Sequence, residues 1–96
     1  SEVYGITKAG VTQLTKYLAA MMASNNINVN CMSPGGILNE KNKQNKKFIN
    51  KYSKRVPMNR MAKVNDFHTC ILFLASENSN YITGQNILID GGLSSW

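Results

Sequence analysis

Tyr4 and Lys8 are the two residues of this 96-residue chain whose types and spacing are best suited to chemistry. In a helix, a spacing of four residues places both side chains on one face, one turn apart. A phenol gives up its proton reluctantly at neutral pH, whereas a positive charge held within about 4–6 Å favours the phenolate. The pair is therefore suited to exchanging a proton with a substrate oxygen. The alternative is a tyrosine and a lysine that lie exposed on a helix and take no part in chemistry.

The first third of the chain predicts the elements that would position this pair. Apolar residues at helical spacing predict a helix over residues 3–24, and the following Asn25 and Asn26 are residues at which helices readily end. Apolar and polar residues then alternate over 27–33, which predicts a strand. A Pro-Gly-Gly sequence at 34–36 ends that strand in a sharp turn.

The remaining two thirds predict an excursion, a second helix and a second strand. Residues 39–63 are polar and basic, with a weak helical periodicity that predicts one or two short helices. We expect Asn65 or Asp66 to cap the next helix, which carries apolar residues on one face. Residues 85–90 predict the final strand.

The net charge of +6 is concentrated in the excursion. Nine of the eleven lysine and arginine residues lie between Lys41 and Lys63, where there is no acidic residue. They form either an electropositive surface for an anionic small molecule or a solvated segment without a partner. Phe48 and Tyr52 either line a substrate lid or form a hydrophobic patch beneath the excursion. No nucleic-acid-binding motif accompanies the charge, so we expect no nucleic-acid partner.

Other features argue against a membrane protein and a metal site. No apolar run approaches the roughly 20 residues of a membrane span, so we expect no membrane partner. Cys31 and Cys70 lie in apolar segments without metal-ligand spacing, and His68 has no cluster of ligands beside it, so we expect no metal. Two reduced, packed thiols predict a cytoplasmic protein.

The order of the elements predicts the fold class. Strands joined through a helix pair in parallel, and parallel sheets are covered by helices. Because two strands alone make a marginal sheet, we expect further strands on the N-terminal side. The sequence therefore predicts an α/β fold, specifically the C-terminal half of a doubly wound parallel-sheet domain of Rossmann-like type.

The whole chain resembles the C-terminal part of the short-chain dehydrogenase/reductase family. The resemblance rests on ordered segments that match the catalytic Tyr-x-x-x-Lys, the strand and Pro-Gly turn beside the nicotinamide, the chain that returns from the substrate-binding excursion, the end of the following helix, and the final loop and strand. In this sequence they are Tyr4–Lys8, 27–37, 55–61, 73–76, 81–85 and 89–92.

The resemblance implies roles for the opening pair. Tyr4 would be the general acid/base that passes a proton to or from the substrate oxygen while hydride moves at the nicotinamide. Lys8 would assist the phenol and hydrogen-bond the nicotinamide ribose.

The resemblance also implies a cofactor-binding turn. Pro34, Gly35 and Ile37 match the turn whose backbone meets the nicotinamide carboxamide and the phosphate side of the cofactor. Asn39 stands where the family often has threonine, and it keeps the ability to hydrogen-bond there. The expected cofactor is NAD or NADP.

The function implied is that of an NAD(P)-dependent oxidoreductase that transfers hydride between nicotinamide and a hydroxyl or carbonyl group of a small molecule. The Pro-Gly-Gly-Ile turn and the basic excursion are similar to members that act in flagellin modification or surface-sugar biosynthesis, which implies a sugar derivative as substrate. We expect residues 1–96 to be the C-terminal part of a single domain that lacks its dinucleotide-binding half, and the chain alone to be inactive. We also expect a homo-oligomer, either a dimer or a tetramer. The alternative is a non-catalytic oligomerisation or interaction module built from the same fold.

Overall fold

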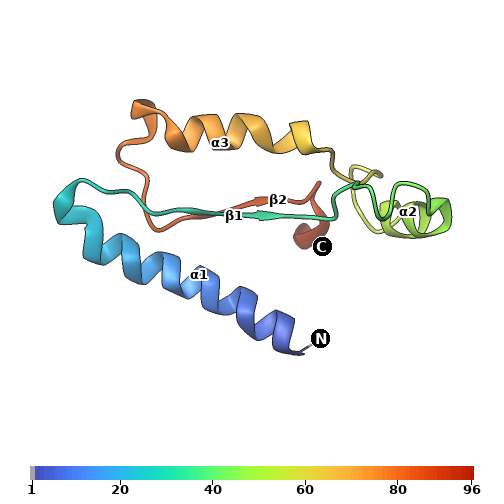
Figure 1. The fold of residues 1–96 in the computed structure, drawn as a ribbon, viewed down its shortest axis with the longest axis horizontal. Helices are drawn as coiled ribbons and strands as arrows, with labels where there is room; N and C mark the ends of the chain where they lie inside the picture. The colour runs from blue at the N-terminus through green and yellow to red at the C-terminus, as the bar shows by residue number, and fades with distance from the viewer. Residues whose placement is uncertain (1) are drawn as a thin grey trace. The chain divides into compact units, whose positions relative to one another are not determined.

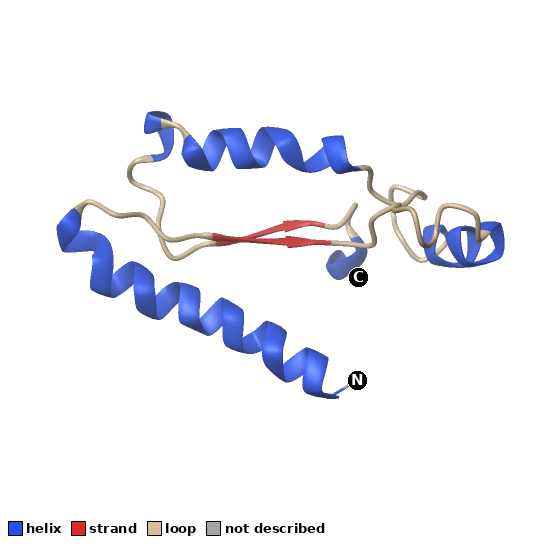
Figure 2. Ribbon diagram, viewed as in Figure 1, coloured by secondary structure: helices blue, strands red, loops and turns tan. Residues whose placement is uncertain are grey.

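The structure is a computed structural model, and it describes residues 2–96 (Figures 1 and 2). Its helices and strands are α1 (Glu2–Met22), β1 (Cys31–Pro34), α2 (Lys46–Ser53), α3 (His68–Ala75) and β2 (Asn86–Ile89). Short 3-10 helices cover Ala23–Asn25, Val64–Phe67, Glu77–Ser79 and Leu93–Ser95. The chain divides into two compact units, the first comprising residues 2–32 with Leu72–Ile87 and the second Ser33–Ile71 with Leu88–Trp96.

The two strands pair in parallel, as the order of elements predicted. The Cys31 N–H donates to the Gln85 carbonyl, and the Gly35 N–H donates to the Ile89 carbonyl, both at 2.9 Å. Both bonds join residues 54 positions apart, so the register is constant along the pair and the strands run in the same direction (Figure 1). The α/β class is therefore confirmed.

The first strand is shorter than predicted, because side chains make most of the hydrogen bonds to the neighbouring segment before Cys31. Asn28 Nδ2 donates to the carbonyls of Ser79 and Asn80, at 3.3 and 3.1 Å. Asn30 Nδ2 donates to the Ile82 carbonyl at 2.9 Å. The polar residues of the alternating stretch thus hold the loop that precedes β2, and regular strand geometry begins only at Cys31.

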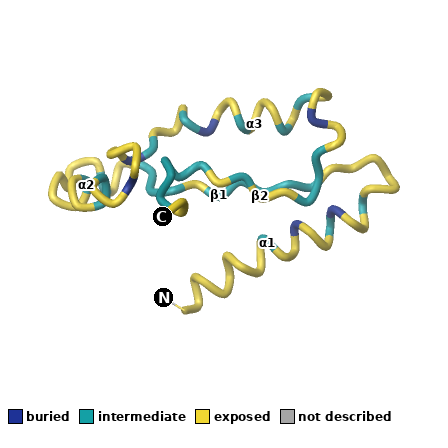
Figure 3. The backbone as a smooth tube through the Cα atoms, turned by 180° about the vertical axis from the view of Figure 1, so that it is seen from behind, coloured by how far each residue is buried: buried dark blue, intermediate teal, exposed yellow. Residues whose placement is uncertain are grey.

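Helix α1 carries the apolar residues that predicted it, yet most of its length is exposed (Figure 3). Thr15 and Ala19 are its buried residues. Leu14 and Met21 are about half exposed, at 53% and 54%. The α-helix ends at Met22, and Asn26 has a φ of 59° after the 3-10 turn. The predicted end of the helix is confirmed, because asparagine tolerates this left-handed conformation.

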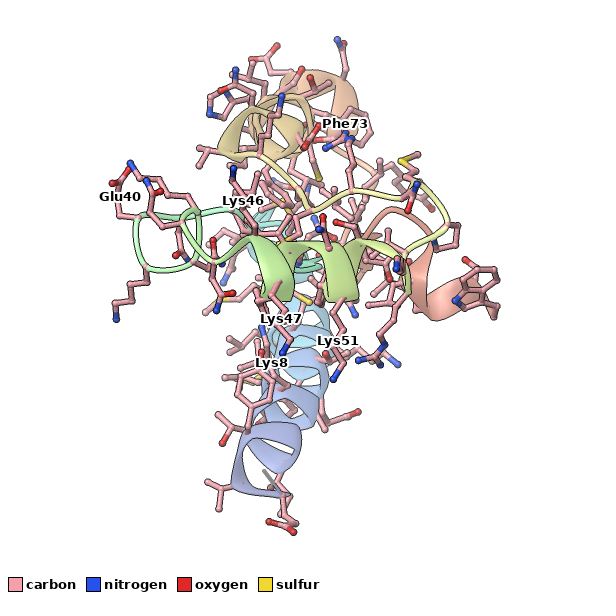
Figure 4. The ribbon with its side chains drawn as sticks, turned by 90° about the vertical axis from the view of Figure 1, so that its right-hand side faces the viewer. Lys8, Glu40, Lys46, Lys47, Lys51 and Phe73 are labelled. Carbon is pink, nitrogen blue, oxygen red and sulfur yellow. The ribbon has the colours of Figure 1, made fainter. Side chains whose placement is uncertain are left out.

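The basic excursion contains one α-helix, in agreement with its weak periodicity. The Asn45 side chain accepts a hydrogen bond from the Phe48 N–H at 3.1 Å, which caps α2. Tyr52 is half-buried, whereas Lys47 and Lys51 are exposed and project from the same side of the helix (Figure 4). The helix therefore presents exposed lysines, whereas its Tyr52 side chain is half-buried and reaches the Gly36 N–H.

The start of the second predicted helix differs from the expectation. Neither Asn65 nor Asp66 is the N-cap residue; a 3-10 helix begins at Val64 with Lys63 as its N-cap, and regular α-helix begins only at His68. Asp66 lies inside this first turn, where its carboxylate accepts from the Lys63 N–H at 2.7 Å. Asp66 therefore bonds an N–H at the start of the helix from a position three residues later. The prediction that it takes part in capping was right, and the predicted capping position was wrong.

Among residues 2–96, no helix combines the length and apolar character needed to cross a membrane.

Candidate active site

Tyr4 and Lys8 lie one turn apart on α1, in the first unit. The Lys8 Nζ is 6.0 Å from the centroid of the Tyr4 ring, at the outer limit of a cation–π contact. Both side chains are exposed, Tyr4 at 65%. The helical spacing therefore brings an ammonium group beside a phenol that a substrate could reach.

The Pro34–Gly36 turn lies in the second unit and follows directly from the end of β1. The Gly35 N–H bonds to the Ile89 carbonyl, and a Cβ on Gly35 would stand 2.9 Å from Asp90 Cα. Since the backbone of Asp90, directly after β2, occupies that space, only glycine fits there without a shift. The turn is thus fastened to the end of the neighbouring strand.

Ile37 carries an available donor at the far side of this turn. It forms an isolated parallel bridge with Ala62, in which the Leu38 N–H donates to the Ala62 carbonyl and the Ala62 N–H donates to the Gly36 carbonyl, both at 2.9 Å. The Ile37 carbonyl accepts from Asn42 Nδ2 at 2.9 Å. The Ile37 N–H has no hydrogen-bond partner anywhere in residues 2–96. An unpaired backbone donor is the group that an amide oxygen, such as that of a nicotinamide carboxamide, requires.

Asn39 uses part of its side chain to shape the next turn. Its Oδ1 accepts from the N–H groups of Lys41 and Asn42, at 2.9 and 3.0 Å. The Asn39 N–H in turn donates to Asn42 Oδ1 at 2.9 Å. Its Nδ2 has no bond to any other residue of the described chain, so a donor remains for a ligand.

A cavity of about 370 Å³ lies within the second unit, beside the glycine turn and the end of β2. Its lining includes Gly35, Gly36, Tyr52, Met58, Arg60 and Asp90. The Tyr52 hydroxyl accepts a hydrogen bond from the Gly36 N–H at 2.7 Å. The sequence suggested that Tyr52 lines a substrate lid or joins a hydrophobic patch, and neither interpretation included this hydrogen bond. The second glycine of the turn was the available signal, because it indicates that a bulky group approaches.

The acidic groups at the cavity are satisfied by neighbouring donors. Arg60 donates to both oxygens of Asp66, at 2.8 and 3.0 Å, and these bonds hold the pKa of Asp66 well below its usual range. Hydrogen bonds from Ser94, and then from Gly92, likewise lower the pKa of Asp90. Asp90 therefore organises the turn after β2.

Known proteins resemble the chain over nearly its whole length. A protein-family model described as enoyl-(acyl carrier protein) reductase matches residues 1–94. The D-arabinitol 2-dehydrogenase (ribulose-forming) of Candida albicans strain WO-1 is 39% identical over 99 residues, which cover 98% of this chain and 35% of that protein.

Solved structures give the same result. A short chain dehydrogenase from Leptospira borgpetersenii serovar Hardjo-bovis, crystallised with bound NAD+, is 47% identical with a TM-score of 0.89, and the match covers 97% of this chain and 35% of that one. A gluconate 5-dehydrogenase from Burkholderia cenocepacia J2315, in complex with NADP and tartrate, is 34% identical with a TM-score of 0.89, covering 97% and 38%.

These relatives also fix the extent of the match. The chain spans little more than a third of the length of each of these proteins. The predicted Rossmann-like fold is confirmed by the structural matches, and the resemblance drawn from the sequence segments is confirmed by the family match. The chain belongs to the short-chain dehydrogenase/reductase family.

Proposed function

We propose that this chain supplies the proton-transfer pair and part of the nicotinamide site of an NAD(P)-dependent oxidoreductase that interconverts a hydroxyl and a carbonyl group. The observation that carries the proposal is the placement of Lys8 Nζ 6.0 Å from the Tyr4 ring on one exposed helix face. The nicotinamide cofactor, when bound, supplies or accepts the hydride. The chain's own residues handle the proton and orient the reactants.

Tyr4 acts as the general acid/base. In carbonyl reduction its hydroxyl gives a proton to the substrate oxygen, and in alcohol oxidation the phenolate takes that proton back. Lys8 contributes a positive charge that favours the phenolate, and it has three N–H donors with which to hold the ribose of the cofactor.

The glycine turn forms the nicotinamide side of the cofactor site. Ile37 donates its unpaired N–H to the carboxamide oxygen, and Asn39, two residues further on, offers its Nδ2 as a second donor to the cofactor. Pro34 and Gly35 leave little side-chain volume at the turn, so a ligand can approach the backbone closely. These donors suit a neutral amide, and they are present whether NAD or NADP is bound.

We further propose that the remainder of the catalytic domain lies N-terminal to these 96 residues and holds the dinucleotide phosphates. Support comes from the Leptospira and Burkholderia proteins, whose structures contain NAD+ and NADP and which are about three times as long as the matched region. The isolated chain is then inactive, because it contains the proton carrier without the rest of the cofactor site.

The substrate we propose is a small polyol or sugar derivative. The similarity to D-arabinitol 2-dehydrogenase supports this class, as do the exposed lysines of α2 if the substrate is anionic. We place the protein in the cytoplasm, where its two free cysteines, both half-buried, would stay reduced.

The test is Tyr4→Phe in the full-length protein, with Tyr17→Phe as its matched control. Tyr17 lies on the same helix and is 60% exposed, so its loss tests the effect of removing a surface phenol alone. We expect Tyr4→Phe to lower kcat by about 10²–10⁴-fold while nicotinamide binding persists, because the lost group acts in proton transfer. Full turnover by Tyr4→Phe, or an equal loss in Tyr17→Phe, would refute the assignment.

Self-association is a second function that one observation favours. Val3, Ile6 and Val11 of α1 are 73%, 73% and 48% exposed, and α1 continues this apolar exposure through Leu14 and Met21. We propose that the full-length protein is a homo-oligomer, a dimer or a tetramer, that buries part of this surface. A monomer by sedimentation across the working concentration range would contradict it.

A further inference from the structure

Tyr52 occupies the space in which position 36 would carry a side chain. A Cβ built on Gly36 would stand 2.7 Å from Tyr52 Cε1 and 2.8 Å from its hydroxyl oxygen, closer than real Cβ contacts come. The same hydroxyl accepts from the Gly36 N–H at 2.7 Å, although the two residues are 16 positions apart. The Tyr52 ring therefore occupies the side-chain space of Gly36, and its hydroxyl holds the backbone of the turn.

The hydrogen bonds on either side of Gly36 fix two successive peptide planes. Tyr52 holds the plane that ends in the Gly36 N–H, and the Ala62 N–H holds the Gly36 carbonyl at 2.9 Å. Glycine is the residue with the most backbone freedom, so these two anchors restrict rotation where the chain is otherwise loosest.

The second of these planes also contains the Ile37 N–H. In a trans peptide the carbonyl and the N–H point in opposite directions, so the bond from Ala62 to the Gly36 carbonyl aims the Ile37 N–H away from Ala62. The direction of that donor depends on the φ and ψ of Gly36. Those angles relate the plane that Tyr52 holds to the plane that Ala62 holds, so loss of the Tyr52 bond frees one of the two anchors.

We propose that Tyr52 is a positioning residue for the cofactor, which acts through the Gly36 N–H to aim the Ile37 N–H at the nicotinamide carboxamide. The inference rests on the proposed function of the turn. It makes the position of α2 in the basic excursion a determinant of cofactor affinity, since Tyr52 lies on that helix.

The first test is Tyr52→Phe in the full-length protein, which removes one oxygen and keeps the ring. We expect the nicotinamide Kd, measured by calorimetry, and the cofactor KM to rise about three- to tenfold, because one hydrogen bond is lost. We expect kcat at saturating cofactor and the substrate KM to change by less than twofold. Tyr81→Phe, at a fully exposed phenol of the other unit, serves as the control and should leave all four constants unchanged.

The second test does not depend on activity. We expect Gly36→Ala to lower the Tm by several degrees when Tyr52 is present, and by clearly less in a Tyr52→Leu background, because the added methyl group meets the ring. The same loss in both backgrounds would show that the contact is absent and would overturn the inference.

The results distinguish the inference from the proposed function on which it rests. A protein that binds nicotinamide with unchanged affinity after Tyr52→Phe refutes the positioning role alone. A protein that binds no nicotinamide at all refutes the proposed function and the positioning role together. Equal increases in cofactor and substrate KM would point to a general packing role and would also overturn the inference.

Discussion

Asp66 is held in its charged form by three hydrogen bonds, two from Arg60 and one from the Lys63 N–H. These donors favour the carboxylate, so the pKa of Asp66 in the folded protein lies well below its ordinary value of 3.8. A group of this kind stabilises the fold fully above its unfolded pKa. The contribution is lost as the pH falls toward the folded pKa.

We therefore predict that Asp66→Asn destabilises the full-length protein most above pH 3.8, and that the difference from the wild type shrinks as the pH falls further. Urea unfolding over a series of pH values measures the free-energy difference directly. Glu77→Gln, at an exposed carboxylate outside this cluster, is the control and should show a much weaker pH dependence. A difference that grows on acidification would contradict the prediction.

Residue spacing in the sequence was sufficient to predict only part of the candidate site. The four-residue interval between Tyr4 and Lys8 was sufficient to predict their shared helix face, because helical geometry is local. The bond between Tyr52 and Gly36 joins positions 16 apart, so no local rule predicts it. The second glycine indicated crowding without identifying the group that causes it.

At the scale of elements, α1 contains two glycines whose Cβ positions face open space within residues 2–96. A Cβ on Gly5 or Gly10 would have no neighbour within 4 Å. Glycine in a helix interior costs about 0.5–1 kcal/mol relative to alanine. No contact within residues 2–96 offsets this cost. A close approach of other protein to this helix face would offset it.

We predict that Gly10→Ala raises the helical circular dichroism of the isolated chain, because the added methyl group favours helix and clashes with nothing. In the full-length protein we expect the same change to lower the Tm, since the remaining domain would approach this face. Gly84→Ala is the contrasting variant, because Gly84 has a φ of 75°, which strains any other residue. A Gly10→Ala variant that stabilises both forms equally would show that this face stays open.

The order of the elements and the ends of α1 followed from sequence patterns, whereas the length of β1 did not. Alternation over 27–33 is a local signal for a strand, but Asn28 and Asn30 direct their amides to the loop at 79–82. Only the tertiary structure decides whether such a side chain or a neighbouring strand satisfies the backbone. The same is true of Asp66, whose capping bond reaches back three residues.

For the whole molecule, we propose that the two-stranded parallel sheet and the exposed α1 are part of a larger fold. Two strands alone are marginal in water. The related dehydrogenases contain nearly three times as much chain as this match covers. The proposed activity therefore belongs to the full-length protein, in which further strands would complete the sheet and the cofactor site.

The most direct test compares nicotinamide turnover by the full-length protein and by the isolated 96-residue chain, with polyol and sugar substrates at equal protein concentrations. We predict oxidation or reduction of the nicotinamide by the full-length protein and none by the isolated chain. Turnover by the isolated chain, or its absence from the folded full-length protein across these substrates with both NAD and NADP, would contradict the proposed function.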